Sequence, residues 1–300
     1  MATPSLPQPG KALVSVEWLA DNLSRSDVKV FESTTNIISD GHGGEKIVAE
    51  YDAFQQGHIP GARFIDLQRD LSDPNAPYPF TVPQLGAFER RLRNLGIDQD
   101  SIVVVYSASN PWWATRIWWL FHHFGLDNAY VLDGGLRQWK ALGHALETGP
   151  GKPVATEGNI RIVAPRRLTV NADTLHGRLG DPQLQLVNAL PPDKFSGAAE
   201  VHGRRGHIPG SINVPAGKLL DPATGLLRDP QSIAVYLEEN GLLTGGRDLV
   251  CYCGGGISAT QLIHALYRAG REDALLYDAS LYEWAHRPEL PLVRKDLQEK

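Results

Sequence analysis

Short apolar runs alternate with amphipathic stretches along almost the whole chain. Apolar runs of this length, rich in β-branched residues, are typical of strands buried on both faces of a sheet. They occur at Val28–Phe31, Ile102–Tyr106, Ala129–Leu132, Leu184–Asn188, Asp248–Tyr252 and Ala274–Tyr277. Amphipathic segments that predict helices lie at Val16–Leu23, Thr115–Phe124, Leu136–Leu142 and Thr260–Ala269. Strands that alternate with helices predict the α/β class, with parallel sheets covered by helices on both faces.

Two motifs occur twice, in the same order and at similar spacing. The segment Gly57–Ala62 reads Gly-His-Ile-Pro-Gly-Ala, and a nearly identical segment lies 149 residues later at Gly206–Ser211. The segment Asp133–Trp139 has a counterpart 145 residues later at Asp278–Trp284. A repeat that keeps its order over half the chain indicates a duplicated domain.

The junction between the two copies is predicted near residues 150–165, within a stretch, 143–167, that is rich in glycine and proline and lacks helical periodicity. We therefore place an N-terminal domain at residues 11–150 and a C-terminal domain at residues 166–292. Residues 1–10 contain three prolines and are expected to form a loose leader and not a signal peptide.

Composition and charge exclude several classes of protein. Hydrophobic residues make up 42% of the 300 residues, which is enough for a full core. The formal net charge of −5 offers no basic excess for nucleic acid, and no apolar run approaches the ~18 residues that a membrane span needs. The two cysteines, Cys251 and Cys253, cannot staple a chain of this length and point to a reducing compartment, the cytoplasm.

The segment around Cys253 carries the clearest chemical signal. An apolar strand ends at this cysteine, three glycines follow, and a helix is predicted from about Ser258. Glycines let a loop curl with successive N–H groups pointing inward, and these donors and the helix N-terminus favour an anion. A thiolate at the edge of such a loop is nucleophilic, and a persulfide would be held in the same way. We expect this sulfur to be open to solvent.

Other uses of the loop fit the residues less well. The loop matches neither glycine-rich nucleotide-binding motif and contains no lysine. A phosphatase loop requires arginine six residues after the cysteine, where this chain has Ala259. Two cysteines without a nearby histidine pair are too few for a metal site. We interpret Cys251, inside the strand, as an inert core residue, and a redox pair of Cys251 with Cys253 stays as a last alternative.

The duplication and the loop together resemble the tandem-domain members of the rhodanese family of sulfurtransferases. The resemblance covers about residues 11–290 and includes Arg116–Trp119 and Cys253–Ala259 as well as the paired motifs. It implies two rhodanese-like domains, of which the C-terminal one is catalytic. The N-terminal half lacks cysteine and would support the site, which makes Trp112 and Trp113 candidates for closing the substrate pocket.

The residues around the loop bear on the sulfur donor. The loop lacks the basic residues of thiosulfate-type members and is closer to Cys-Gly-Ser-Gly-Val-Thr-Ala of the mercaptopyruvate type, although Gly255 replaces the serine proposed to relay protons. The histidine and aspartate partners of the family are not evident. In its anion-binding segment Leu190 replaces the first arginine and Lys194 keeps the second charge. Arg204 and Arg205 could supply the missing charge. We hypothesise poor turnover of both donors.

Three further residues have structural interpretations. His58 and His207, each followed by Ile-Pro-Gly, are expected to fix turns through their ring nitrogens. Ser258 is expected to cap the following helix, and its hydroxyl could also donate to the sulfur.

The predicted mechanism is a double displacement. Cys253 attacks a small sulfur donor, and a thiol, cyanide or a thioredoxin-like protein then removes the sulfur from the persulfide. The persulfide would be held by the N–H groups of Gly254, Gly255, Gly256, Ile257 and Ser258. No metal or organic cofactor is implied, and neither a nucleic acid nor a membrane is an expected partner. The alternative is a low-turnover persulfide carrier that serves a protein partner.

Overall fold

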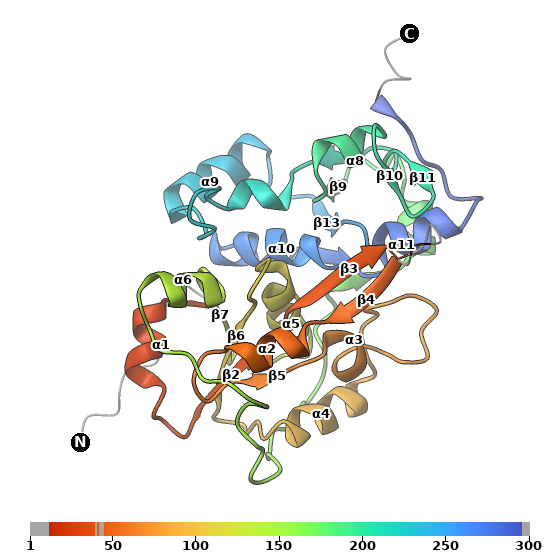
Figure 1. Cartoon of the computed structure of the whole chain (residues 1–300). Helices are drawn as coiled ribbons and strands as arrows, with labels where there is room; N and C mark the ends of the chain where they lie inside the picture. Colours follow the sequence, from red (N-terminus) through yellow and green to blue (C-terminus); the bar gives the residue numbers. More distant parts are fainter. Residues whose placement is uncertain (1–11, 40, 42–44, 296–300) are drawn as a thin grey trace. The chain divides into compact units, whose positions relative to one another are not determined.

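The computed structural model describes residues 12–39, 41 and 45–295, so the expected leader lies outside the described part of the chain. The chain forms two compact units (Figure 1). Of the described residues, the first unit contains those up to Pro74, Val82–Arg166 and Thr224–Leu226. The second contains Asn75–Thr81, Arg167–Ala223 and the described residues from Leu227 onward.

The first unit is built around a five-stranded parallel sheet of order β1-β7-β6-β2-β5. Its strands are β1 (Leu13–Val14), β2 (Val28–Glu32), β5 (Arg63–Phe64), β6 (Ile102–Tyr106) and β7 (Ala129–Leu132), and β3 (Thr35–Ser39) and β4 (Glu45–Ala49) form a separate antiparallel hairpin. Its helices are α1 (Val16–Asn22), α2 (Tyr51–Gln56), α3 (Leu67–Asp70), α4 (Leu85–Asn94), α5 (Trp112–His123) and α6 (Gly135–Ala141).

The second unit repeats this plan, with a parallel sheet of order β12-β9-β13-β14-β8. Its strands are β8 (Thr169–Val170), β9 (Leu184–Asn188), β12 (Ile212–Asn213), β13 (Asp248–Tyr252) and β14 (Leu275–Tyr277), and β10 (Glu200–Val201) pairs with β11 (Arg204–Arg205). Its helices are α7 (Ala172–Gly177), α8 (Pro192–Ser196), η1 (Ala216–Leu219), α9 (Pro230–Glu239), α10 (Ser258–Arg268) and α11 (Ser280–His286). The strands of the two sheets correspond in chain order: β1 to β8, β2 to β9, β5 to β12, β6 to β13 and β7 to β14. Corresponding strands have corresponding neighbours in the two sheets, which confirms the predicted duplication.

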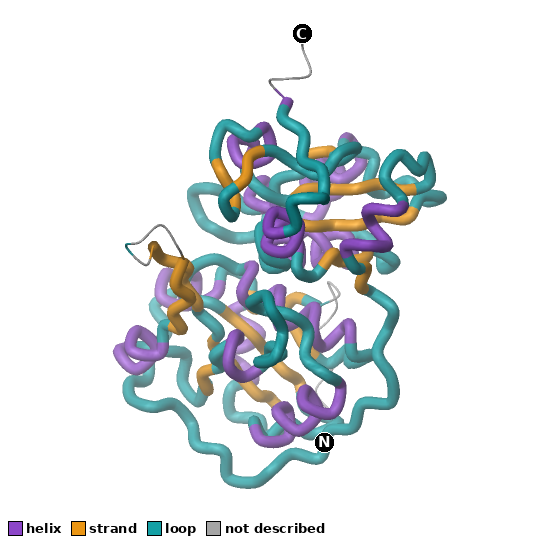
Figure 2. Tube along the Cα trace, turned by 90° about the vertical axis from the view of Figure 1, so that its right-hand side faces the viewer, coloured by secondary structure: helices purple, strands orange, loops and turns teal. Residues whose placement is uncertain are grey.

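Helices lie on both faces of each sheet, so the predicted α/β class is confirmed (Figure 2). Every predicted strand and helix is present, although α5 begins at Trp112 and not at Thr115. The hairpins β3–β4 and β10–β11 were not predicted. In the described part of the chain, no helix combines the length and the apolar character needed to cross a membrane.

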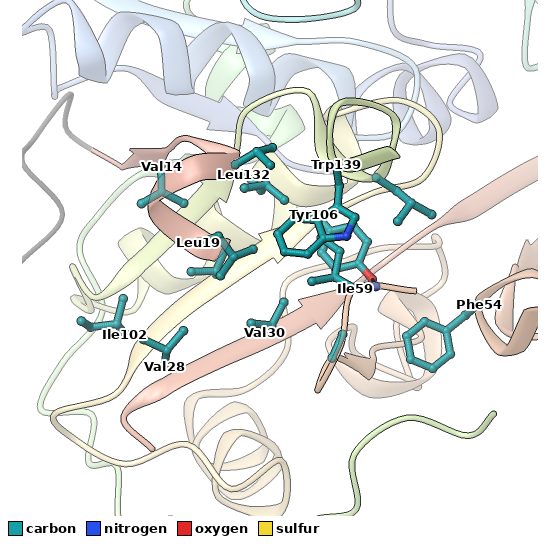
Figure 3. Close-up of a cluster of buried hydrophobic side chains, with 14 residues drawn as sticks. Val14, Leu19, Val28, Val30, Phe54, Ile59, Ile102, Tyr106, Leu132 and Trp139 are labelled. Atoms are coloured by element: carbon teal, nitrogen blue, oxygen red, sulfur yellow. Dashed lines mark hydrogen bonds between the residues drawn. The ribbon is translucent and has the colours of Figure 1, made fainter. Parts of the chain in front are cut away.

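The core of the first unit lies between its sheet and the helices α1 and α6 (Figure 3). Val30 and Val104 from neighbouring strands pack with Leu19 of α1 and Trp139 of α6. All residues of β6 are buried, as a continuous apolar run predicts for a central parallel strand.

His58 and its neighbours fix the turn before β5. The His58 ring stacks on Phe54 with centroids 3.9 Å apart, and its Nδ1 lies 2.9 Å from the Phe54 carbonyl oxygen. The amide of Ile59 donates to the Tyr106 hydroxyl at 3.1 Å. Both Ile59 and Tyr106 belong to the core that Figure 3 shows.

The second unit repeats these contacts. The His207 ring stacks on Phe195 at 3.8 Å, and its Nδ1 lies 2.8 Å from the Phe195 carbonyl oxygen. The amide of Ile208 donates to the Tyr252 hydroxyl at 3.1 Å. Burial lowers the pKa of His207, as expected for a ring packed in a turn. The structural interpretation of both histidines is confirmed.

Candidate functional site

Cys253 lies between β13, the central strand of the second sheet, and α10. Open parallel sheets bind ligands at the carboxyl ends of their strands, which is where this residue stands. In the loop that follows, Gly256 has φ of 72°, a left-handed conformation that glycine adopts without strain. Four amides of this loop donate to no acceptor within the described residues: those of Gly254, Gly255, Ile257 and Ser258.

The amide of Gly256, one of the predicted donors to the sulfur, is hydrogen-bonded to Ser280 instead. The Ser280 hydroxyl oxygen accepts from the Gly256 amide at 3.2 Å and from the Cys253 amide at 3.0 Å, and the hydroxyl donates to the Tyr277 carbonyl at 2.8 Å. Sequence reasoning missed Ser280. The available signal was its position in the repeat, where the first unit has Gly135.

The Cys253 side chain is 1% exposed. The expectation of a sulfur open to solvent is therefore wrong. Gly254, Gly255 and Ser258 are partly exposed, so the loop itself reaches solvent.

Cys251 is fully buried, and burial raises the pKa of its thiol to about 12. A thiol of this kind stays protonated at neutral pH and is inert. The interpretation of Cys251 as a core residue is confirmed. Both cysteines are free thiols, and the high pKa of Cys251 is unfavourable for a redox pair with Cys253.

The N-terminus of α11 contacts the outer side of the loop. The amide of Leu281 donates to the Cys253 carbonyl at 3.1 Å, and the amide of Tyr282 donates to the Gly254 carbonyl at 2.7 Å. Nε2 of His202 lies 3.1 Å from the same Gly254 oxygen. Nothing in the sequence pattern marked His202, because the hairpin between β10 and β11 that positions it was not predicted.

Ser258 does not cap α10. The helix begins at Ser258 itself, and the residue before it, Ile257, makes no side-chain capping bond. The expectation of a Ser258 cap is wrong because the helix starts one residue earlier than that role requires. Thr260 donates its hydroxyl to the Ile257 carbonyl at 2.7 Å and so occupies part of this terminus.

Leu190, which stands where an arginine was expected from the resemblance, lies against the loop. A Cβ atom placed on Gly254 would be 4.0 Å from Leu190 Cδ2. The Leu190 side chain is 8% exposed, so the surface next to the loop is apolar at this point. Lys194, the remaining charge of the segment, is partly exposed on α8.

Arg204 and Arg205 are both committed to main-chain carbonyl oxygens. Arg204 donates to the carbonyl oxygens of residues 284, 287 and 290 at 3.1–3.4 Å. Arg205 donates to the carbonyl oxygens of Gly197 and Ala198. These bonds tie the β10–β11 hairpin to its surroundings and do not support the expectation that either arginine replaces the charge lost at Leu190.

The first unit contains a counterpart of the loop without a thiol. Ser107 occupies the place of Cys253, because Leu136 donates its amide to the Ser107 carbonyl at 3.2 Å, as Leu281 does to Cys253. Trp112 and Trp113 begin α5 directly after this loop, and Trp113 is 4% exposed.

The chain therefore combines a duplicated parallel α/β domain with a cysteine at the head of a loop whose amides have no acceptor among the described residues. The rhodanese-like domain family matches residues 15–142 and 171–287, and the chain belongs to this family. The family expected from the sequence is thereby confirmed.

Known relatives match over most of their length. A thiosulfate/3-mercaptopyruvate sulfurtransferase of Arabidopsis thaliana is 32% identical over 94% of this chain and 86% of the relative. The 3-mercaptopyruvate sulfurtransferase of Escherichia coli is 29% identical over 93% of this chain and 96% of its own length. The crystal structure of the Escherichia coli 3-mercaptopyruvate sulfurtransferase SseA matches with a TM-score of 0.76 at 28% identity, over 90% of this chain and 98% of that one.

Proposed function

We propose that this protein is a sulfurtransferase that moves a sulfane sulfur from a small donor to a thiol or cyanide through a persulfide on Cys253. The observation that carries the proposal is the set of four loop amides after Cys253 that have no acceptor in the described part of the chain. Unsatisfied main-chain donors of this kind stabilise an anion. The sulfurtransferase names of the full-length relatives support the same activity.

The proposed reaction consists of two nucleophilic displacements and needs no oxidant or reductant. The Cys253 thiolate attacks the outer sulfur of the donor, an Sγ–S bond forms, and the donor's remaining group leaves with the electron pair of the broken bond. An acceptor thiolate or cyanide then attacks that outer sulfur, and Cys253 leaves as the thiolate. The amides of Gly254, Gly255, Ile257 and Ser258 would bind the persulfide, and one such donor is typically worth about 10²–10³-fold in rate.

The apolar surface at Leu190 bears on the choice of donor. Thiosulfate and 3-mercaptopyruvate both carry an anionic group that a bidentate arginine would bind, and Leu190 offers no charge. We propose poor turnover of both compounds and better use of a persulfide or polysulfide donor. Lys194 is then the remaining cation of this segment that we propose for substrate binding.

A persulfide carrier is the second candidate, and the 1% exposure of Cys253 favours it. A buried sulfur exchanges only after a local rearrangement, which would slow multiple turnover and suit transfer to a docked thiol protein of the thioredoxin kind. The free thiols fit a reducing compartment, and we propose the cytoplasm.

The enzyme and the carrier are distinguished by a panel of donors. Thiosulfate, 3-mercaptopyruvate and inorganic polysulfide are each supplied with cyanide, and thiocyanate release is followed for the wild type, Cys253→Ala and Cys251→Ala. We expect multiple turnovers with polysulfide, none with Cys253→Ala, and near-normal activity with Cys251→Ala.

Three results would contradict parts of this proposal. Activity that survives Cys253→Ala would exclude the persulfide mechanism on this residue. Efficient use of thiosulfate or 3-mercaptopyruvate would remove the proposal on donors. A stable adduct of one sulfur without repeated turnover would favour the carrier.

A further inference from the structure

The carbonyl groups at the start of the Cys253 loop are held from outside. The Cys253 carbonyl accepts from the Leu281 amide at 3.1 Å. The Gly254 carbonyl accepts from two donors, the Tyr282 amide at 2.7 Å and Nε2 of His202 at 3.1 Å. A carbonyl oxygen only accepts, so His202 Nε2 carries a proton in this bond.

Held carbonyls determine where the next amides point. A trans peptide group directs its C=O and its N–H to opposite sides, and the described chain contains no cis peptide bond. The bonds to the Cys253 and Gly254 carbonyls therefore turn the amides of Gly254 and Gly255 away from α11. These are two of the four amides that have no acceptor.

Ser280 fixes the loop from the same side. Its hydroxyl is fully used, since it accepts from the Cys253 and Gly256 amides and donates to the Tyr277 carbonyl. Ser280 is completely buried and has φ of 53°, a left-handed conformation that costs energy in a residue other than glycine. A residue in a strained conformation persists where the surrounding structure holds it in place.

The first unit shows the same backbone without this device. Gly135 stands in place of Ser280 with the same φ of 53°, and a Cβ atom there would lie 2.3 Å from the Ser107 carbonyl oxygen. A serine is thus accommodated only in the unit that carries the cysteine. In the second unit, His202 lies in the turn between β10 and β11, with its ring 4.3 Å from that of Tyr282.

We propose that His202 and Ser280 are positioning residues for sulfur transfer, which hold the loop's peptide groups so that its free amides face the sulfur of Cys253. The inference rests on the proposed function and adds two residues that act through the loop. Neither residue needs to touch the substrate. Loss of either should slow persulfide formation without a matching change in donor binding.

The test is the rate of persulfide formation on the full-length chain. Inorganic polysulfide is the probe, and intact mass follows an adduct of about 32 Da, one sulfur atom. His202→Phe keeps a ring against Tyr282 but removes the donor, and Ser280→Gly removes the hydroxyl while suiting the left-handed conformation. We expect both to load about tenfold or more slowly at saturating polysulfide. The concentration for half-maximal rate should change by less than about twofold.

Two further variants separate positioning from a general loss of structure. His202→Gln restores an N–H donor and should recover most of the wild-type rate. His286→Phe is the matched control, because the His286 ring stacks on Tyr282 at 5.4 Å but its Nδ1 contacts the Tyr282 carbonyl and not the loop. It should load at the wild-type rate.

The outcomes separate the two claims. If the wild type acquires the adduct and His202→Phe and Ser280→Gly load equally fast, the positioning role is wrong and the proposed function stands. The positioning role of His202 is also wrong if His202→Gln stays as slow as His202→Phe. If the wild type acquires no adduct on Cys253, the proposed function falls and the positioning role falls with it.

Discussion

Leu190 is the residue that most directly links this chain's surface to its substrates. It places an apolar side chain against Gly254, at a position where the resemblance to the family leads us to expect an arginine. Leu190→Arg should raise kcat/KM for thiosulfate and 3-mercaptopyruvate by about tenfold or more, because a charge-assisted pair replaces an apolar contact. Leu190→Met, of similar size without charge, should not. Steady-state assays of both variants decide this, and an unchanged kcat/KM in Leu190→Arg would show that another group selects the donor.

Glu32 is a second residue with a measurable consequence. It is 1% exposed, and burial raises the pKa of its carboxyl above the ordinary 4.5 in spite of the hydrogen bond from Thr34 at 2.8 Å. Because the folded state favours the neutral acid, ionisation destabilises the fold; the penalty is absent well below pH 4.5, grows as the pH rises from 4.5 to the folded pKa, and is constant above it. Glu32→Gln should therefore raise the unfolding free energy at pH 7.

The pH dependence gives this prediction its control. The gain from Glu32→Gln should shrink as the pH is lowered toward 4.5, where wild-type Glu32 is neutral when folded. Glu157→Gln, at an exposed position, should leave the unfolding free energy unchanged both at pH 7 and near pH 4.5. A gain that is equal at both pH values, or absent at both, would contradict the assignment of a buried, destabilising carboxyl.

The strands and helices of this fold were predictable from local sequence patterns. A strand that is buried on both faces, such as β6 or β13, appears in the sequence as an unbroken apolar run. What was missed depends on contacts between segments far apart in sequence. The β10–β11 hairpin places His202 beside Gly254, 52 residues away in the sequence. Its two strands are only two residues long, so no local pattern predicts it. Ser258 was assigned a capping role from its residue type, but the helix includes it. Cys253 was identified from its loop, whereas its burial follows from packing.

The turns that precede β5 and β12 depend on tyrosines of the central strands. Tyr106→Phe removes the acceptor of the Ile59 amide, which is buried, and should lower the unfolding free energy by about 1–3 kcal/mol. Tyr51→Phe, at a residue 38% exposed, is the control and should have little effect. Denaturant titration measures both, and equal stability of Tyr106→Phe and wild type would show that the turn does not need the hydroxyl.

Duplication has left two loops of unequal chemistry in one chain. In the first unit the Ala108 amide donates to the Thr34 hydroxyl at 2.9 Å, the Ser109 amide donates to the Ser107 hydroxyl at 3.1 Å, and Pro111 has no amide hydrogen. These donors are already used, whereas the amides of Gly254, Gly255, Ile257 and Ser258 have no acceptor among the described residues. The sequence revealed the duplication and the missing cysteine, but the direction of each amide follows only from the folded chain.

This asymmetry predicts that a thiol alone does not make a second site. Ser107→Cys in a Cys253→Ala background should acquire no stable sulfur adduct from polysulfide, because its loop offers too few free amides. The measurement is intact mass on the folded protein. An adduct at residue 107 as stable as that of the wild type would mean that the amides after Cys253 are dispensable.

The central claim is that one sulfur, on Cys253, accepts and holds another in a loop of main-chain amides. The most direct test is peptide mass mapping of the wild type, Cys253→Ala and Cys251→Ala after brief exposure to inorganic polysulfide and removal of the excess. The account predicts a single adduct of about 32 Da on Cys253 in the wild type and in Cys251→Ala, and none in Cys253→Ala. An adduct on Cys251, or an unmodified Cys253 in the wild type, would contradict it.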